Sequence, residues 1–212
     1  MKKETKKNLY IFICLLTMFV IWTFLVYTVD VQAIGPNRST VGFATLNRSF
    51  HEFTGVHISL YNLTDWFSLI PLGIVVGFAI LGLVQWIKRK DILSVDRSII
   101  ALGVFYIIVF AVFIFFEFFV INYRPVLIDG KLETSYPSST TMLVMCVMPT
   151  AMMQFNARMK NKRLKPFILL ASTAFITFMV VCRLISGVHW MTDIIGGVLL
   201  SSALVILYNA YK

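Results

Sequence analysis

Long apolar runs separated by short polar or basic connectors divide this chain from end to end. The first run, residues 9–29, has about the 20 residues that a helix needs to cross the hydrocarbon core of a bilayer. Further runs, two of them short for a full crossing, follow at 66–87, 99–121, 139–154, 167–182 and 191–208. The pattern predicts an all-α, polytopic membrane protein with six transmembrane helices in a single domain, residues 1–212.

The polar segment between the first two runs, residues 30–62, keeps a weak helical periodicity. Its apolar side chains recur at helical spacing, at Phe43, Leu46, Phe50, Phe53 and Val56. We expect this segment to lie along the membrane surface, with His51 and His57 as interfacial side chains. Residues 31–33 resemble a signal-peptide cleavage site, but the preceding apolar run exceeds the usual length of about 7 to 15 residues, which favours a retained span.

Composition supports the membrane class. Hydrophobic residues make up 58% of the chain and charged residues only 14%, and the mean hydropathy is +0.83. The net charge of +9 comes from short basic clusters between apolar runs, which favours anionic lipid head groups over nucleic acid as their partner. The three cysteines, Cys14, Cys146 and Cys182, lie within or at the end of apolar runs and have neither disulfide nor metal-ligand spacing. No metal or other cofactor is expected.

The basic residues also predict the orientation. Fourteen of the 19 fall on one side of the predicted spans, at Lys2, Lys3, Lys6, Lys7, Lys88, Arg89, Lys90, Arg97, Arg158, Lys160, Lys162, Arg163, Lys165 and Lys212. Because cytoplasmic connectors carry an excess of Lys and Arg, both termini are predicted in the cytoplasm of a multi-pass cell-membrane protein. Three polar stretches, around Arg124, Ser138 and His189, then face the outside together.

The segment from Cys182 to Gly197 carries the strongest candidate chemistry. His189 and Asp193 are four residues apart, so on a helix they share a face and the carboxylate can accept the Nδ1 proton, which leaves Nε2 bare and nucleophilic. Arg183, six residues before His189, could bind the same phosphate with its planar guanidinium. A His–Asp pair at a helix start is also a common cap or polar anchor, and this alternative stays open.

Two other outward stretches suit phosphate. Pro137 to Thr140 opens the fourth span, so the hydroxyls of Ser138, Ser139 and Thr140 and the free backbone N–H groups form an anion-binding helix start. Arg124 ends the third span beside Pro125. An ordinary N-cap at Ser138 and a snorkelling anchor at Arg124 are the alternatives for each alone. Together the stretches predict a phosphate pocket.

In these residues the chain resembles the type 2 phosphatidic acid phosphatase family of membrane lipid phosphatases, whose core is shared with the vanadium haloperoxidases. That family has a lysine seven residues before Arg-Pro, then Pro-Ser-Gly-His, then Ser-Arg followed six residues later by His and four later by Asp. The third motif here reads Cys182-Arg183, His189 and Asp193, with Gly187-Val188 before the histidine and Gly196-Gly197 after the aspartate.

The resemblance implies roles for the matching residues. His189 would attack phosphorus, Asp193 would orient it, and Arg124 and Arg183 would neutralise the transferring phosphoryl group, beside Ser138.

Two positions depart from the family. Glu117 stands where the family has its lysine, and Thr140 stands where it has the second-motif histidine that protonates the leaving oxygen. Glu117 is expected to pair with Arg124 or Arg183, to be protonated, or to face a cationic ligand group. The hydroxyl of Thr140 cannot act as a general acid near neutral pH.

The predicted function is therefore a membrane lipid phosphatase or phosphotransferase at the outer side of a bacterial-type cytoplasmic membrane. It would act on a phospholipid phosphate or an isoprenoid diphosphate through a phosphohistidine at His189. The alternative is a non-catalytic relative that binds or carries a lipid phosphate. A channel or transporter is less favoured, because the polar residues cluster at one membrane surface.

Overall fold

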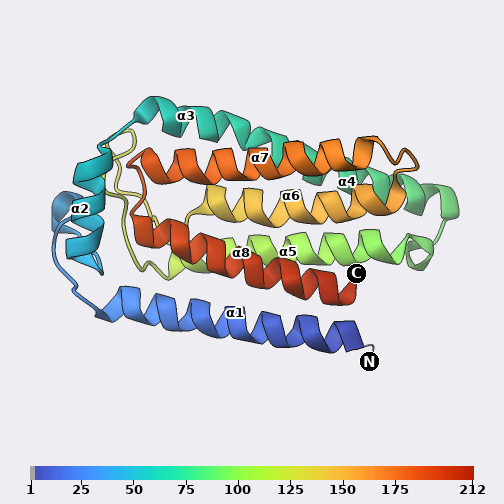
Figure 1. Ribbon diagram of the computed structural model, residues 1–212, viewed down its shortest axis with the longest axis horizontal. Coiled ribbons are helices and arrows are strands. Elements are labelled where there is room, and N and C mark those ends of the chain that lie inside the picture. Colours follow the sequence, from blue (N-terminus) through green and yellow to red (C-terminus); the bar gives the residue numbers. More distant parts are fainter. Residues whose placement is uncertain (1–2) are drawn as a thin grey trace.

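The computed structural model describes residues 3–212, and helices make up most of this part of the chain (Figure 1). Within these residues no β-strand forms, and antiparallel backbone pairing is limited to three isolated bridges. The α-helices are α1 (Lys3–Thr28), α2 (Ala44–Thr54), α3 (Ile58–Phe67), α4 (Leu69–Arg89), α5 (Arg97–Phe118), α6 (Ser139–Arg158), α7 (Leu164–Ile185) and α8 (Met191–Tyr211). The prediction of an all-α membrane protein is confirmed.

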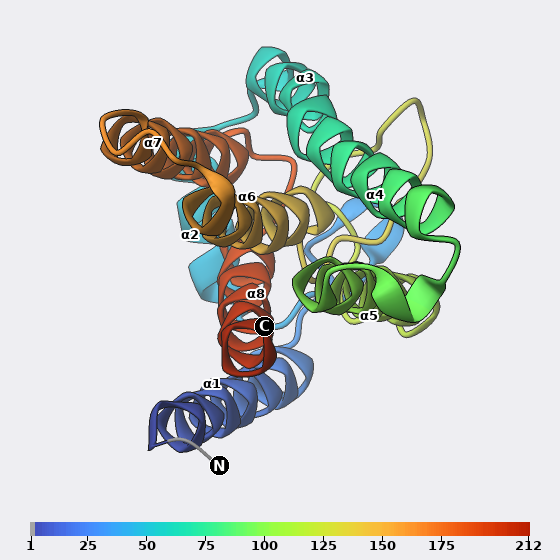
Figure 2. The same cartoon turned by 90° about the vertical axis from the view of Figure 1, so that its right-hand side faces the viewer.

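Five segments of the described chain are long and apolar enough to cross a membrane: α1, Ile58–Arg89 (α3 with α4), α5, α7 and α8. The sixth long helix, α6, is less apolar and contains Pro149. It lies at the centre of the bundle, in contact with α4, α5, α7 and α8 (Figure 2). A helix surrounded by protein does not need the lipid-facing apolar surface that a peripheral span requires.

Three predicted spans differ from the structure in their limits. The second begins at Ile58 and not near residue 66, because α3 continues almost directly into α4. The fourth and fifth predicted runs, 139–154 and 167–182, lie within longer helices: α6 has 20 residues and α7 has 22. Both have the length to span a bilayer core of about 30 Å, since a helix rises about 1.5 Å per residue.

Part of the segment predicted to lie on the membrane surface, residues 30–62, forms α2, which crosses one end of the bundle roughly perpendicular to the long helices, and its last residues begin α3 (Figure 1). Phe43, the first residue of the predicted periodic stretch, precedes α2 in the left-handed conformation with φ of 47°. The aromatic side chain of Phe53 is exposed on this helix. An exposed aromatic on a helix at the bundle end suits the headgroup region of a bilayer.

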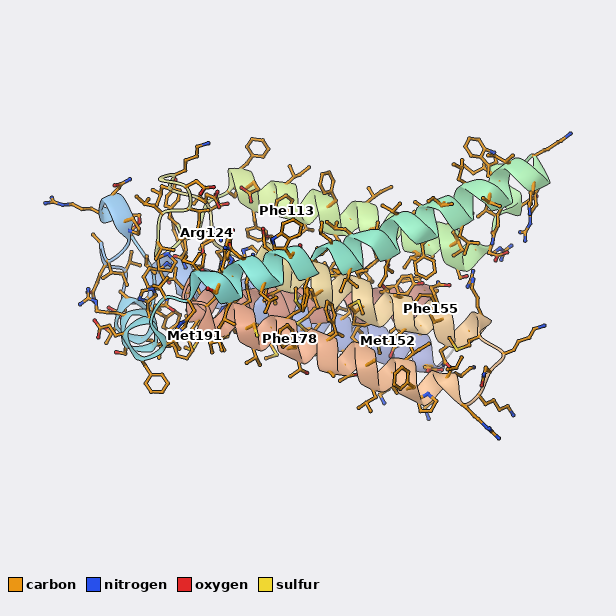
Figure 3. All side chains as sticks on the ribbon, turned by 90° about the horizontal axis from the view of Figure 1, so that it is seen from above. Phe113, Arg124, Met152, Phe155, Phe178 and Met191 are labelled. Carbon is orange, nitrogen blue, oxygen red and sulfur yellow. The ribbon has the colours of Figure 1, made fainter. Side chains whose placement is uncertain are left out.

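The two ends of the bundle are chemically different. The start of α1 and the C-terminus lie at one end, together with the basic connectors α4–α5 and α6–α7, and Figure 3 shows charged side chains extending there. Asp96 at this end pairs with Arg89 at 3.1 Å and with Arg158 at 3.2 Å. The other end holds α2, the α5–α6 connection and the α7–α8 turn (Figure 1). The three polar stretches expected to share one membrane surface therefore lie at the same end.

Helix α1 fixes the start of α8 beside that polar end. The indole of Trp22 donates to the carbonyl of Thr192 at 3.2 Å, and the hydroxyls of Thr23 and Tyr136 are 2.6 Å apart. Gly196 is required here, because a Cβ atom at this position would lie 2.6 Å from the Tyr136 ring. The absence of a side chain thus allows the loop before α6 to pack directly on α8.

Candidate active site

The α5–α6 connection forms a short hairpin that carries the first group of site residues. Asp129 and Gly130 both have positive φ, 49° and 74°. Ile128 and Lys131 on either side of them exchange backbone hydrogen bonds of 3.1 and 2.9 Å, as in a two-residue type I′ turn. An isolated bridge between Tyr123 and Thr134 continues this antiparallel pairing toward the bundle.

The hairpin register sends four polar side chains to one face. In an antiparallel pair, opposite residues point to the same side and successive residues alternate. Asn122 is opposite Ser135, and Arg124 is opposite Glu133, with backbone hydrogen bonds of 2.9 and 3.0 Å between them. All four therefore share the face that lies over the start of α8, while Thr134 points the other way.

Ser135 connects His189 to Asp193. The Nδ1 atom of His189 lies 3.0 Å from the Ser135 hydroxyl and 3.2 Å from the Ser135 carbonyl oxygen. A carbonyl only accepts, so Nδ1 carries the proton and Nε2 is the bare nitrogen. The Ser135 hydroxyl donates in turn to Asp193 Oδ2. The direct Nδ1-to-carboxylate bond expected from the spacing is not formed, because the two atoms are 3.9 Å apart.

Asp193 is held by three donors. Besides Ser135, the amide of Asn122 donates to Oδ1 at 3.0 Å and the backbone N–H of Trp190 donates to Oδ2 at 2.9 Å. The bond from the Trp190 N–H caps α8, so Asp193 also acts as the helix cap named as the alternative. Capping and orientation of His189 coexist, because the same carboxylate accepts both the start of the helix and Ser135.

His189 lies in the turn between α7 and α8 with only 3% of its surface exposed. Its Nε2 atom has no hydrogen-bond partner within the described residues. Burial first, then the charges of Arg124 and Arg183, hold the pKa of His189 well below its usual value of 6.5. The imidazole therefore stays neutral through the mildly acidic range, as a nucleophilic Nε2 requires.

Gly187 makes the turn that places His189. Its φ is 67°, and a Cβ atom there would lie 2.0 Å from the carbonyl oxygen of Gly55. The Gly187 carbonyl also lies 3.1 Å from Nε2 of His51. His57 bonds to Thr54 through its ring, at 2.8 Å, and its backbone N–H donates to Ser186. His51 and the backbone of His57 thus contact the turn between α7 and α8 from outside.

The two arginines meet at Tyr61 of α3. The guanidinium carbons of Arg183 and Arg124 lie 4.4 and 5.5 Å from the centre of its ring. Such contacts are favourable for each cation and reduce the cost of holding two like charges close together. Tyr61 thus brings Arg124 of the hairpin and Arg183 of α7 to the same place, as a shared phosphate site would need.

Each arginine already has an acidic partner, and neither partner is Glu117. Arg124 Nε lies 3.2 Å from Glu133, and Arg183 Nη2 lies 3.2 Å from Asp65. Glu117 instead accepts from the Thr134 hydroxyl at 2.7 Å. The expected Glu117–arginine ion pair is therefore absent from the described residues, because the hairpin places Glu133 nearer to Arg124.

Arg183 is almost fully buried, at 1% exposure. It donates to the hydroxyls of Thr140, at 2.6 Å, and Thr64, at 2.9 Å. Thr140, at the place of the family's proton donor, thus serves as an acceptor that positions an arginine.

A cavity of about 520 Å³ opens between the hairpin and the ends of α5 and α6. Its polar lining includes Arg124, Glu117, Glu133, Ser139 and His189.

Ser138 is buried beside this cavity and caps α6, because its hydroxyl accepts from the backbone N–H of Thr141 at 3.5 Å. The N-cap alternative is therefore correct for this residue. The first N–H groups of α6, which have no acceptor within the helix, still supply partial positive charge at the cavity.

The structure thus brings together the predicted residues His189, Asp193, Arg124 and Ser139, with Arg183 and Thr140 in an adjoining layer. It adds residues that were not predicted: Tyr61, Asp65, Asn122, Glu133 and Ser135. Asn122 and Ser135 lie within two residues of Arg124 and Pro137, so their proximity to the recognised motifs was a usable signal. Tyr61 and Asp65 had no such signal, because they come from a segment distant in sequence.

A family model described as the PAP2 superfamily matches residues 104–212, just over half of the chain. The fold and site define a membrane protein of the phosphatase type. The chain belongs to the PAP2 superfamily of type 2 membrane lipid phosphatases, in which a phosphohistidine intermediate is the usual mechanism.

Among solved structures, the chain is similar to a transmembrane PAP2 type phosphatidylglycerolphosphate phosphatase from Bacillus subtilis. The identity is 16% and the TM-score 0.61, over 93% of this chain and 94% of the other. At that identity the likeness shows a common fold. A comparison with curated proteins found no match.

Replacing Ser135 by alanine is expected to lower kcat about 10²-fold, because misplacing a reacting group by about 1 Å costs that much and Ser135 joins His189 to Asp193. Phosphate release by the purified variant measures the effect. Ser135→Thr keeps a hydroxyl and should recover part of the rate, while Ser49→Ala, on the exposed face of α2, is the matched control. A Ser135→Ala enzyme with unchanged kcat would show that the carbonyl of residue 135 alone orients the imidazole.

Proposed function

We propose that this protein removes or transfers a phosphoryl group from a lipid phosphate or isoprenoid diphosphate through a phosphohistidine at His189. The observation that carries the proposal is the bare Nε2 atom of His189, which is buried without a partner at a cavity that Arg124 also lines. A neutral imidazole with a fixed tautomer beside a cation is suited to attack on an anionic phosphoryl group.

The other residues have roles that follow from their positions. Asp193 orients His189 through Ser135 and stabilises the positive charge that develops on the imidazole. Arg124 and the first turn of α6, with Ser139, receive the phosphoryl oxygens, while Ser138 caps that turn. Arg183, positioned by Thr140, adds a second positive charge beside Tyr61.

Two further cavities form an apolar groove along the bundle, which supports a lipid-linked substrate. The first, of about 400 Å³, shares Phe113, Ser139 and Met142 with the cavity at His189, here called the phosphate cavity. It shares Tyr106 and Phe110 in turn with a further cavity of about 660 Å³ between α4 and α5. Apolar side chains dominate the walls of both, so a lipid chain can extend from the phosphate cavity along the bundle without leaving apolar surroundings.

Phosphate release tests this proposal. Purified protein in detergent is given long-chain lipid monophosphates, isoprenoid diphosphates and glycerol phosphate, which has no lipid chain. We expect turnover of at least one lipid substrate and little or none of glycerol phosphate. Turnover of glycerol phosphate equal to that of the lipid substrates would contradict a role for the apolar groove. The absence of turnover on every substrate would favour the binding function.

A protein that binds or carries lipid phosphate without hydrolysing it is the second candidate. The observation that favours it is the pairing of each arginine with a carboxylate, Glu133 or Asp65, together with Thr140 at the position of the proton donor. Saturable binding of a radiolabelled lipid phosphate, with no phosphate released, would establish this second function.

The site is predicted to face the outside, with both termini in the cytoplasm. In a variant without Cys14, Cys146 and Cys182, a cysteine replacing Lys131 at the hairpin tip should react with an impermeant maleimide on intact cells. A cysteine replacing Lys160, at the opposite end of the bundle, should react only after the membrane is opened. The reverse pattern would show that the site is cytoplasmic, against the charge distribution of the connectors.

A further inference from the structure

We propose that Glu117 and Glu133 form a cation subsite, and that among lipid monophosphates the site prefers those that carry a protonated amine in the same headgroup as the phosphoryl group. This inference rests on the proposed function, because it places the cation subsite in the same cavity as the phosphoryl site.

The two carboxylates come from different elements and line the same cavity. Glu117 lies in the last turn of α5, and Glu133 lies on the hairpin opposite Arg124. Glu117 uses Oε2 to accept from Thr134, at 2.7 Å, so within the described residues Oε1 is available to a ligand. The Glu133 side chain is 40% exposed and can bind a ligand while it faces Arg124.

The phosphoryl end of the cavity is identified by unpaired buried groups. Nε2 of His189 and Nη1 of Arg124 are buried without hydrogen-bond partners in the described part of the chain, and both residues are at most 8% exposed. A buried polar group without a partner is costly, and a ligand that pairs with it removes that cost. A phosphoryl oxygen can accept from Arg124 while its phosphorus faces His189.

Two helix ends of opposite partial charge line the cavity. The amino end of α6, at Ser139, contributes partial positive charge. The carboxyl end of α5, which carries Glu117, contributes partial negative charge. A ligand with a single anionic group would be attracted to one helix end and repelled from the other. A zwitterionic headgroup complements both.

The test compares two substrates that differ in one group. A long-chain 2-aminoalkyl phosphate and the alkyl phosphate of the same chain length without the amine are turned over by purified protein in the presence of EDTA. We expect kcat/KM to be about tenfold higher for the amine, mainly through KM. Equal kcat/KM values for the two substrates would overturn the inference, as would a preference for the amine that is seen without EDTA and disappears when EDTA is added. Turnover of the substrates would still support the proposed function in either case. Failure of both substrates in turnover and in binding would count against both.

Variants assign the preference to the carboxylates. Glu117→Gln and Glu133→Gln should each raise KM for the amine substrate and lower KM for the substrate without it, since removing a negative charge weakens the attraction of the amine and the repulsion of the phosphate. Glu117→Lys should reverse the preference. Glu52→Gln, an exposed residue of α2 outside the cavity, is the matched control and should retain it. A loss of activity that is equal for both substrates would mean that the glutamates are structural, and would overturn the subsite.

Discussion

Replacing His189 by alanine is expected to abolish lipid phosphate turnover, with a loss of about 10⁴-fold or more in kcat, because no other nucleophile takes its place when a covalent catalyst is removed. The structure gives His189 the required properties: a fixed tautomer through the Ser135 carbonyl, a free Nε2 and a pKa well below 6.5. Phosphate release by wild-type and variant protein is the measurement.

A second measurement identifies the intermediate. Wild-type protein mixed with ³²P-labelled substrate and quenched rapidly in alkali should retain label that is lost in acid, as expected for phosphohistidine. His189→Ala should retain none, whereas His57→Ala, whose ring bonds to Thr54 outside the cavity, should behave as wild type. Wild-type-like turnover in His189→Ala would exclude a phosphohistidine at this position.

The helical bundle was predictable because its signal is local. Apolar runs of crossing length identify the long helices, and the excess of basic residues distinguishes the two ends of the bundle. The limits of α6 were harder to predict, because a helix buried among others carries polar residues such as Thr150 and Gln154 in place of the lipid-facing side chains that define a span. The hydropathy pattern therefore does not mark the carboxyl end of α6.

The sequence predicted only those site residues that belong to the family's motifs. His189, Asp193 and Arg124 are marked by spacing, whereas the route from His189 to Asp193 through Ser135 depends on a hairpin. Asp129-Gly130 is a recognisable turn signal, but the residues around it lack the alternating apolar pattern that would predict paired strands. Without the hairpin register, the 3.9 Å separation of imidazole and carboxylate cannot be foreseen.

Glu117 and Thr140 both depart from the family pattern, and the structure explains them differently. Thr140 has a definite partner, since it accepts from Arg183. Glu117 has only the Thr134 hydroxyl within the described residues, and it faces a cavity. Thr140 therefore positions Arg183, while the Glu117 carboxylate lines the cavity of the proposed site.

Isoprenoid diphosphates should be turned over about 10² to 10⁴ times faster than phosphatidic acid of matched chain length, since that is the usual contribution of a general acid and Thr140 cannot supply one. An alkoxide leaving from a monophosphate is strongly basic and needs a proton in the transition state. A lipid phosphate leaving from a diphosphate is a much weaker base and needs none. Rates of phosphate release from the two substrates, measured at the same pH, test this expectation.

Two substitutions separate the missing acid from the support of Arg183. Thr140→His restores an ionisable group at the position and should raise monophosphate turnover, which narrows the gap between the substrates. Thr140→Val removes the hydroxyl that accepts from Arg183 but supplies no acid, so both rates should fall together and the gap should persist. Equal rates on the two substrates in the wild type, with no gain in Thr140→His, would show that another group protonates the leaving oxygen. Glu117 and Glu133 would then be the groups to test, because their carboxyls line the same cavity as His189.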